Sequence, residues 1–251
     1  MQKLTTYIVS PLIILILMLY PFQPAGRSQG FTYVPPKEIN LAIKEVEAKI
    51  VDSLKIESIY DSLNLKKYGL KKEAFNFAYT GYTKLIEKGM LSKKGILTIC
   101  DFSQSSRRKR LYLIDLDQQK LLMNTYVAHG RNSGGEYARK FSNRPESRQS
   151  SLGFYKTKRT YYGGHGLALT LTGLEQGFND KAERRKIVVH GSDYIGENYL
   201  RYSNTMGRSF GCPAIPKKYA TKLINTIKNG SCLFIYHPTK QYLEESKILN
   251  G

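Results

Sequence analysis

The chain has 251 residues and a formal charge of +19, with 39 lysines and arginines against 20 aspartates and glutamates. Hydrophobic residues make up 41% and aromatic residues 12%, which excludes a chain that is disordered throughout and allows a sizeable buried core. Three cysteines are too few for a disulfide scaffold, and none has zinc-ribbon spacing, so we expect no metal site. The positive charge favours anionic surroundings such as nucleic acid, a membrane surface or an acidic cell wall.

Residues 1–30 resemble an export segment. Lys3 precedes an apolar run at residues 7–20, which is shorter than the roughly 20 residues that a spanning helix needs. Pro21 and Pro24 then break any helix. The segment predicts either a signal peptide that is removed or an N-terminal membrane anchor that stays. In both cases we expect an exported protein of the periplasm or cell envelope, where cysteines can be oxidised.

Residues 31–92 predict a linker and a helical lead. Residues 37–64 and 71–88 carry apolar side chains at helical spacing, and Gly69 separates the two stretches. The first stripe consists of Ile39, Ile43, Val46, Ile50 and Leu54, and the second of Phe75, Tyr79, Tyr82 and Ile86. We interpret the second as a packing face because its period is helical. Our hypothesis for the whole lead is a cover or docking element.

Residues 93–251 predict a β-rich domain, so the fold class is α+β with an antiparallel or mixed sheet. Strands are expected at 96–100, 111–116, 121–128, 152–157, 167–171, 187–189 and 233–236. A turn and short helix are expected at 177–186, and a helix at 216–228. The basic loop 103–110 reads as a solvated turn, whereas the long polar loop 130–150 has a length typical of functional loops.

The chemistry concentrates in residues 187–216. An apolar strand ends at His190 and Gly191, and a polar loop then leads to Ser209, Gly211 and Cys212. A cysteine attacks a carbonyl as its thiolate, and a nearby imidazole can accept its proton. Backbone N–H groups in the glycine-containing turn could stabilise the resulting oxyanion. The spacing alone leaves open whether Cys212 is a nucleophile or a buried structural cysteine.

Five further residues are candidates for substrate binding. His129 ends a strand before Gly130, and His165 lies among glycines that would expose it. Each of these histidines has a structural alternative. Arg131, Arg144 and Arg148 could hold a peptide carboxylate, since the guanidinium fork matches carboxylates, or could be solvated loop charges.

The other two cysteines, Cys100 and Cys232, lie in apolar strand runs. We interpret them as small core hydrophobes, with a bridge between them as the alternative.

Taken together, these residues resemble a known family. His190-Gly191 followed by Ser209-x-Gly211-Cys212 is similar to the signature of the murein L,D-transpeptidases (YkuD-like), and Pro213-Ala214 suggests the branch with an SxGCPA motif. Residues 150–155 (SSLGFY) resemble the family's T-P-x-G-x-F element, and residues 127–130 occupy the place of its preceding strand-end turn. The resemblance covers roughly residues 95–236.

The resemblance implies a β-rich catalytic domain and a two-step acyl transfer on peptidoglycan stem peptides. Cys212 would form a thioester, His190 would act as base and then acid, and Ser209, Gly211 and Gly191 would shape the site. An amine acceptor would give a 3–3 cross-link, and no cofactor or metal is implied. The family's imidazole is oriented by a backbone carbonyl, which the sequence does not identify. The Pro-Ala after the cysteine and a longer His-to-Cys loop depart from better-known members.

Three alternatives compete with this interpretation. Hydrolysis of the same acyl-enzyme would make the protein an L,D-carboxypeptidase. A papain-like or NlpC-type peptidase is disfavoured, because those enzymes place the cysteine before the histidine. A non-catalytic wall-binding protein would use the basic surface alone, while a nucleic-acid partner is not expected because no RNA- or DNA-binding motif occurs. The sequence predicts no oligomeric state.

Overall fold

The computed structural model describes residues 36–251. The apolar run at residues 7–20, with its expected export or anchoring role, lies outside this range. None of the helices within the range combines the length and apolar character that a membrane span requires. The chain divides into two units, residues 1–48 and 49–251, and the second contains the sheet.

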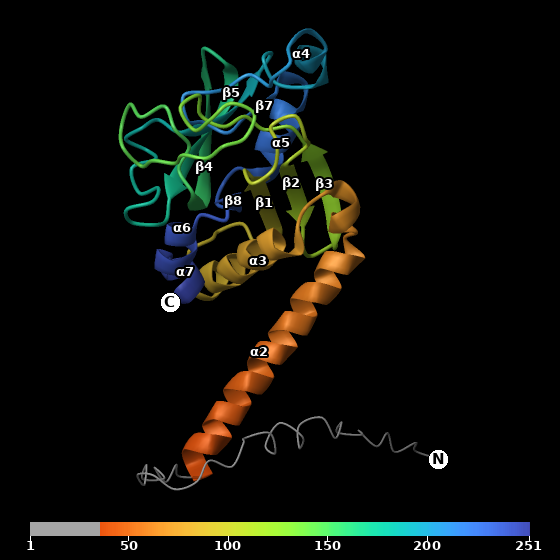
Figure 1. The fold of residues 1–251 in the computed structure, drawn as a ribbon, viewed down its shortest axis with the longest axis vertical. Helices are drawn as coiled ribbons and strands as arrows, with labels where there is room; N and C mark the ends of the chain where they lie inside the picture. Colours follow the sequence, from red (N-terminus) through yellow and green to blue (C-terminus); the bar gives the residue numbers. More distant parts are fainter. Residues whose placement is uncertain (1–35) are drawn as a thin grey trace, which may run out of the picture. The chain divides into compact units, whose positions relative to one another are not determined.

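Helices precede a run of six strands, and short helices flank the last two strands, a largely segregated order that is typical of an α+β protein (Figure 1). The helices are α2 (Pro36–Ser62), the 3-10 turn η2 (Leu65–Tyr68), α3 (Lys72–Glu87), α4 (Glu197–Tyr202), α5 (Lys217–Ile227), α6 (Lys240–Glu245) and α7 (Lys247–Asn250). The strands are β1 (Ile96–Asp101), β2 (Leu111–Asp115), β3 (Lys120–Thr125), β4 (Gly153–Gly163), β5 (Gly166–Gly173), β6 (Val188–Ser192), β7 (Ala214–Pro216) and β8 (Cys232–Tyr236).

The eight strands form one mixed sheet in the order β3-β2-β1-β8-β4-β5-β6-β7. The pairs β1–β8 and β6–β7 are parallel, and the other neighbours are antiparallel. Every residue of β1 and β8 is buried, as a continuous apolar run predicts for a strand covered on both faces. The α+β class with a mixed sheet is therefore confirmed.

Helix α3 belongs to the same core as the sheet. It packs against β1 and β8, and its Phe75 and Leu85 are fully buried. The packing face predicted from the aromatic stripe is thus confirmed for Phe75 and Tyr82. The compact unit that contains the sheet begins at residue 49, and α3 buries its apolar face in the core of that unit. The expected boundary near residue 93 stays a prediction.

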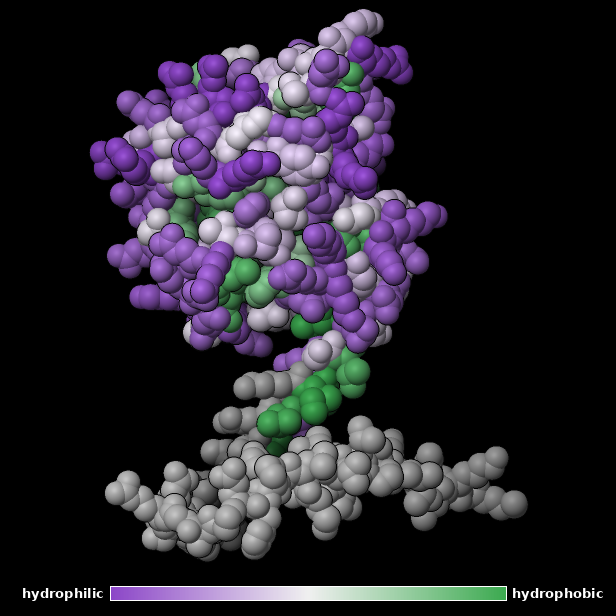
Figure 2. All heavy atoms as spheres, in the orientation of Figure 1, coloured by the Kyte–Doolittle hydropathy of each residue, from purple (hydrophilic) through white to green (hydrophobic). Residues whose placement is uncertain are grey.

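The apolar stripe of α2 behaves differently along its length. Tyr60 and Leu63 at its C-terminal end are buried in the core, whereas Ile50 and Leu54 are 54% and 61% exposed. Figure 2 shows apolar side chains gathered on this helix. The helical periodicity is correct, but residues 36–251 provide no packing partner for Ile50 and Leu54.

Two local expectations need correction. Residues 177–186 form successive turns and no helix, because the Asn179 side chain caps Glu175 N–H and also donates to the carbonyls of Leu152 and Phe154. These bonds fold the segment back onto β4. Strand β4 itself continues beyond the expected end at residue 157, since residues 160–163 pair with β5 in a long hairpin.

The two strand cysteines are free and buried. Cys100 pairs with Ile235 across β1–β8, while Cys232 pairs with Leu97. Three positions of offset put the thiols on opposite faces of the sheet, about 10 Å apart along the strands. A disulfide needs Cα atoms within about 7 Å, so this register favours the core-hydrophobe interpretation.

Candidate active site

The fold brings His190 and the segment that carries Cys212 to adjacent strands. His190 lies within β6 and pairs with Ala214 of β7 in a parallel ladder, and Cys212 lies two residues before β7. The residues between them form the α4 region, whose polar loop leaves the sheet and returns to it. The long separation along the chain therefore becomes a short one between two adjacent strands.

The Cys212 thiol points at the segment before β6. Its Sγ donates to the carbonyl of Lys186 at 3.7 Å, and the side chain is partly exposed. Burial raises the pKa of the thiol, while the backbone N–H of Val188 and the charge of Arg185 act in the opposite direction. We therefore expect a protonated thiol at neutral pH.

The turn before Cys212 is closed by Ser209. Its hydroxyl donates to the Cys212 carbonyl at 2.6 Å and accepts from Gly211 N–H at 3.0 Å. Gly211 has φ of +125°, and a Cβ there would lie 2.7 Å from the carbonyl oxygen of Gln149, so no side chain fits. Ser209 occupies Gly211 N–H, whereas the N–H groups of Phe210 and Cys212 have no acceptor among residues 36–251. The Cys212 N–H is our candidate donor to an oxyanion.

The His190 imidazole is buried, and a backbone carbonyl orients it. Nδ1 lies 3.0 Å from the carbonyl oxygen of Gly191, so the neutral ring carries its proton there and leaves Nε2 as the acceptor. Gly191 also lets α5 approach β6, because a Cβ would lie 2.8 Å from that of Ala220. Burial lowers the pKa of His190, the Gly191 carbonyl raises it, and the charge of His165 lowers it. The resting pair is a neutral imidazole and a neutral thiol.

His165 lies at the tip of the β4–β5 hairpin, directly over the catalytic strand. Its ring stacks on that of His190, with centroids 4.5 Å apart and planes inclined by 24°. The side chain is exposed to solvent. The hairpin thereby places a second imidazole beside the first, and the expected role of His165 near substrate stays a prediction.

His129 is fully buried, which favours its structural alternative over a position that lines the substrate site. Its Nδ1 accepts from Arg110 Nη2 at 2.7 Å, and Nε2 lies 3.3 Å from the Gly134 carbonyl. Burial and the charge of Arg110 lower the pKa of His129 to about 4. His129 therefore holds the start of loop 130–150.

The sequence predicted that the basic loop 103–110 is a solvated turn, but its last residue, Arg110, is not solvated. Its side chain is fully buried and stacks on Phe102, with the guanidinium carbon 4.7 Å from the ring centroid. It donates to the carbonyls of Val127 and Gln104 as well as to His129. Burial lowers the pKa of Arg110 to about 10, which leaves it charged at neutral pH.

Arg131 and Arg144 both carry exposed side chains. Arg131 is tied to the site through its backbone, because its N–H donates to the Ser209 carbonyl at 2.8 Å. Arg144 N–H donates to the Ser142 hydroxyl. Neither side chain lines a cavity beside Cys212, so their role in binding stays a prediction.

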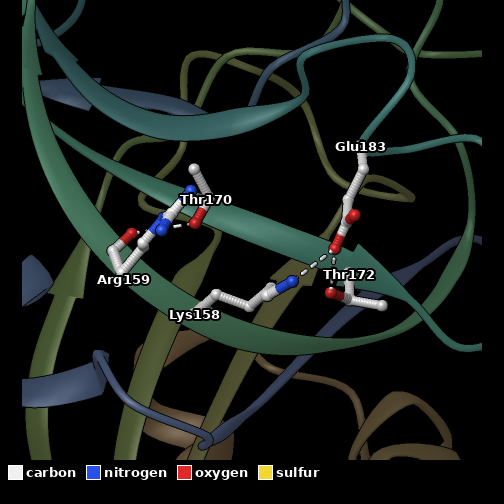
Figure 3. Close-up of polar contacts among 5 residues, drawn as sticks. All are labelled: Lys158, Arg159, Thr170, Thr172 and Glu183. Carbon is white, nitrogen blue, oxygen red and sulfur yellow. Dashed lines mark hydrogen bonds and ion pairs between the residues drawn. The ribbon is translucent and has the colours of Figure 1, made fainter.

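Two cavities meet at Lys186, whose carbonyl faces the Cys212 thiol. The first, about 400 Å³, lies between β4, β5 and the start of β6. Figure 3 shows its polar edge, where Lys158 Nζ and Thr172 Oγ1 both donate to the Glu183 carboxylate. The second cavity, about 820 Å³, is lined chiefly by Arg148, Arg184, Arg185 and Lys186.

The lining residues Arg184, Arg185 and Lys186 were absent from the sequence-based candidates. The signal that could have revealed them is their position, since this basic triplet directly precedes the strand that carries His190. No cluster of three or more metal-ligating side chains occurs among residues 36–251.

Residues 66–236 match the family model described as L,D-transpeptidase catalytic domain. The match covers well over half of the chain and includes α3 as well as the sheet. The protein therefore belongs to the family of L,D-transpeptidase catalytic domains, as the signature around His190 and Cys212 predicted. Whether the motif Ser209–Ala214 defines a particular branch stays a prediction.

Several solved structures resemble parts of the chain at low identity. An L,D-transpeptidase from Mycobacterium smegmatis is 11% identical with a TM-score of 0.36, over 57% of this chain and 59% of that one. The helical cell shape determining protein Pgp2 (K307A mutant) from Campylobacter jejuni is 14% identical with a TM-score of 0.39, over 64% and 56%. An L,D-transpeptidase from Stackebrandtia nassauensis is 16% identical with a TM-score of 0.32, over 72% and 76%. The chain thus spans under two thirds of the first two proteins, and no curated protein matches it.

Proposed function

We propose that this protein is an exported L,D-transpeptidase of peptidoglycan that uses Cys212 as nucleophile and His190 as base. The observation that carries the proposal is the position of His190 in β6 and of Cys212 two residues before the adjacent parallel strand β7, within a chain of the L,D-transpeptidase family. A neutral imidazole and a neutral thiol suit a mechanism in which the base removes the thiol proton during attack.

In the first step His190 Nε2 takes the thiol proton while Cys212 Sγ attacks the carbonyl of the L-centre of a stem tetrapeptide. The Cys212 N–H stabilises the oxyanion. The C–N bond then breaks, the imidazolium gives its proton to the departing amine, and the terminal D-residue leaves. A thioester on Cys212 remains.

In the second step an amine of another stem peptide attacks the thioester. His190 accepts a proton from this amine and returns it to sulfur as the C–S bond breaks. The product is a 3–3 cross-link, and the free thiol is restored. Water in place of the amine would give the carboxypeptidase reaction.

The test is incubation of the purified protein with tetrapeptide muropeptides, followed by mass spectrometry of the products, with Cys212→Ala in parallel. We expect a cross-linked dimer and a released D-amino acid, both absent from the variant. Release of the D-residue without dimer would make the protein a carboxypeptidase. Binding of muropeptides without any turnover, unchanged in Cys212→Ala, would support the wall-binding alternative.

Location and partners form part of the same proposal. The apolar run at residues 7–20 supports export, either as a signal peptide or as a membrane anchor. Expression in a bacterial host, with fractionation and N-terminal sequencing, distinguishes a cleaved protein from an anchored one. Recovery of the full chain from the cytoplasm would contradict export.

A further inference from the structure

The larger cavity beside Cys212 carries a concentration of positive charge that the acyl transfer itself does not use. Its 820 Å³ is lined by Arg148, Arg184, Arg185 and Lys186, with Glu146 as its one acidic residue. None of the ion pairs found in residues 36–251 involves these four cations. Like charges gathered without internal compensation raise the local concentration of anions.

Two lining residues connect this cavity to Cys212. Lys186 lines it and accepts from Cys212 Sγ through its carbonyl at 3.7 Å, while Phe210 lines it from the turn that leads to Cys212. The Arg148 guanidinium stacks over the Phe210 ring, with its carbon 4.8 Å from the centroid. A ligand in this cavity would therefore lie against the two segments that flank the thiol.

The four cations have different tasks. Arg185 is engaged, since it donates to Ser142 O, Gln149 O and the hydroxyls of Ser147 and Ser151, and so fixes the loop 142–151. Arg148, Arg184 and Lys186 are exposed at the cavity, and no hydrogen bond from their side-chain nitrogens occurs within residues 36–251. These three are the groups available to a ligand.

The backbone around the cavity is unusual. Glu146, Arg148 and Lys186 have φ values of 59°, 53° and 53°, in the left-handed region that non-glycine residues rarely adopt. Such conformations concentrate at binding and catalytic sites, where the surrounding structure maintains them. Here they turn Arg148 and Lys186 toward one cavity from two separate loops.

We infer that this cavity is a carboxylate subsite, which binds a free carboxylate of a stem peptide through Arg148, Arg184 and Lys186. The inference rests on the proposed function, because the peptide substrate is what makes carboxylate the relevant anion. Guanidinium forks match carboxylates in geometry, and charge-assisted hydrogen bonds are roughly twice as strong as neutral ones. A carboxamide offers one acceptor and no charge, so the subsite would select against amidated stems.

The test measures binding to the full chain carrying Cys212→Ala, with two probes: a stem tetrapeptide with free side carboxylates and the same peptide with these as carboxamides. Calorimetry should show about ten-fold or more tighter binding of the free acid. The additional double substitution Arg148→Asn/Arg184→Gln should remove this preference. Asparagine tolerates the left-handed conformation at position 148. Arg108→Gln, at an exposed arginine of another loop, is the matched control and should retain the preference.

Three results would overturn the subsite: equal affinity for both probes, binding of neither probe, or a preference for the free acid that survives the double substitution. Mass spectrometry of the parent protein with the same peptides separates the two claims. Acylation of Cys212 by both peptides alike, with equal binding, would leave the proposed function standing without the subsite. Tighter binding of the free acid without any acylation of Cys212 would support the subsite and contradict the proposed function.

Discussion

At the scale of the residue, the chemistry depends on how protons are distributed between Cys212 and His190. Burial raises the pKa of the thiol and lowers that of the imidazole, so both directions disfavour a resting thiolate–imidazolium pair. The nucleophile must then be generated during attack, which makes the position of the His190 ring essential. The Gly191 carbonyl fixes the tautomer, and His165 stacks on the ring.

The rate of Cys212 alkylation tests this distribution. We expect the rate with iodoacetamide to rise with pH through a midpoint above about 8.5, the usual thiol value, because burial disfavours the thiolate. Mass spectrometry of the digested protein assigns the modified cysteine and separates it from Cys100 and Cys232. A rate that is already maximal at pH 6 would reveal a preformed thiolate and contradict this account.

The hydroxyl of Ser209 is expected to affect turnover by shaping the turn. Ser209→Ala removes the donor to the Cys212 carbonyl and frees Gly211 N–H, so the Cys212 N–H loses its fixed direction. We expect kcat to fall about ten- to a hundred-fold, with a smaller change in KM. Ser209→Thr keeps the hydroxyl and should recover most of the activity. An unchanged kcat in the alanine variant would show that the turn keeps its conformation without the Ser209 hydroxyl.

At the scale of the element, single side chains fix segments that are distant in sequence. His165 stacks the β4–β5 hairpin on His190, Arg185 holds the loop 142–151, and the buried carboxylate of Glu175 holds the C-terminal helices. That carboxylate accepts from Phe154 N–H at 2.8 Å and Tyr242 OH at 2.9 Å, and also from the Ser246 hydroxyl. One side chain thereby joins β4 to α6 and α7.

Removal of this carboxylate should weaken the whole domain. Glu175→Ala leaves three buried donors unpaired, so we expect the free energy of unfolding to fall by about 3 kcal/mol or more. Urea denaturation measures the change. Glu245→Ala, at an exposed position of the same C-terminal region, should change the free energy by less than about 0.5 kcal/mol. Equal effects of the two substitutions would argue against the Glu175 connection.

Periodicity predicted most of these elements because their apolar faces are buried within the domain. Helix α3 and strands β1, β2 and β8 lie close to their expected limits for this reason. The turns at 177–186 were harder, since Asn179 there bonds to groups on β4 that are distant in sequence. The burial of Arg110 was also not predicted, because a charged residue in a basic loop gives no local sign that it will donate hydrogen bonds to carbonyls elsewhere in the fold.

At the scale of the whole molecule, pH acts on stability as well as on catalysis. His129 is fully buried beside Arg110, and its folded-state pKa of about 4 lies below the roughly 6.5 of an unfolded histidine. Between these values the unfolded chain binds more protons than the folded one. The neutral His129 therefore contributes its full share to the free energy of unfolding above about pH 6.5, and this contribution is lost as the pH falls toward 4.

Comparison of the protein with His129→Gln tests this linkage. Glutamine can still accept from Arg110 but does not titrate. We expect acidification from pH 6.5 to 4 to lower the free energy of unfolding by up to about 3 kcal/mol more in the parent than in the variant. His190 and His237, whose pKa values are also lowered, contribute equally to both. Parallel pH profiles of the two proteins would contradict the assignment to His129.

The candidate site was only partly predictable at this scale. His190 and Cys212 could be found because they lie in one short segment with a recognisable spacing. Arg148 was among the sequence-based candidates for binding a carboxylate, but Arg184 and Lys186 were not, since two separate loops must fold together before these residues face one cavity. His129 lies at a strand end, as the sequence indicated, but its ring is buried and hydrogen-bonds to Arg110.

The central claim is that Cys212 carries the acyl group, and intact-protein mass spectrometry tests it most directly. The purified protein is mixed with a stem tetrapeptide and quenched in acid within seconds. The account predicts an adduct equal in mass to the peptide without its terminal D-residue, less one water, located on Cys212 and absent from Cys212→Ala. A folded protein that releases the D-residue without such an adduct, or whose Cys212→Ala variant still releases it, would contradict the account.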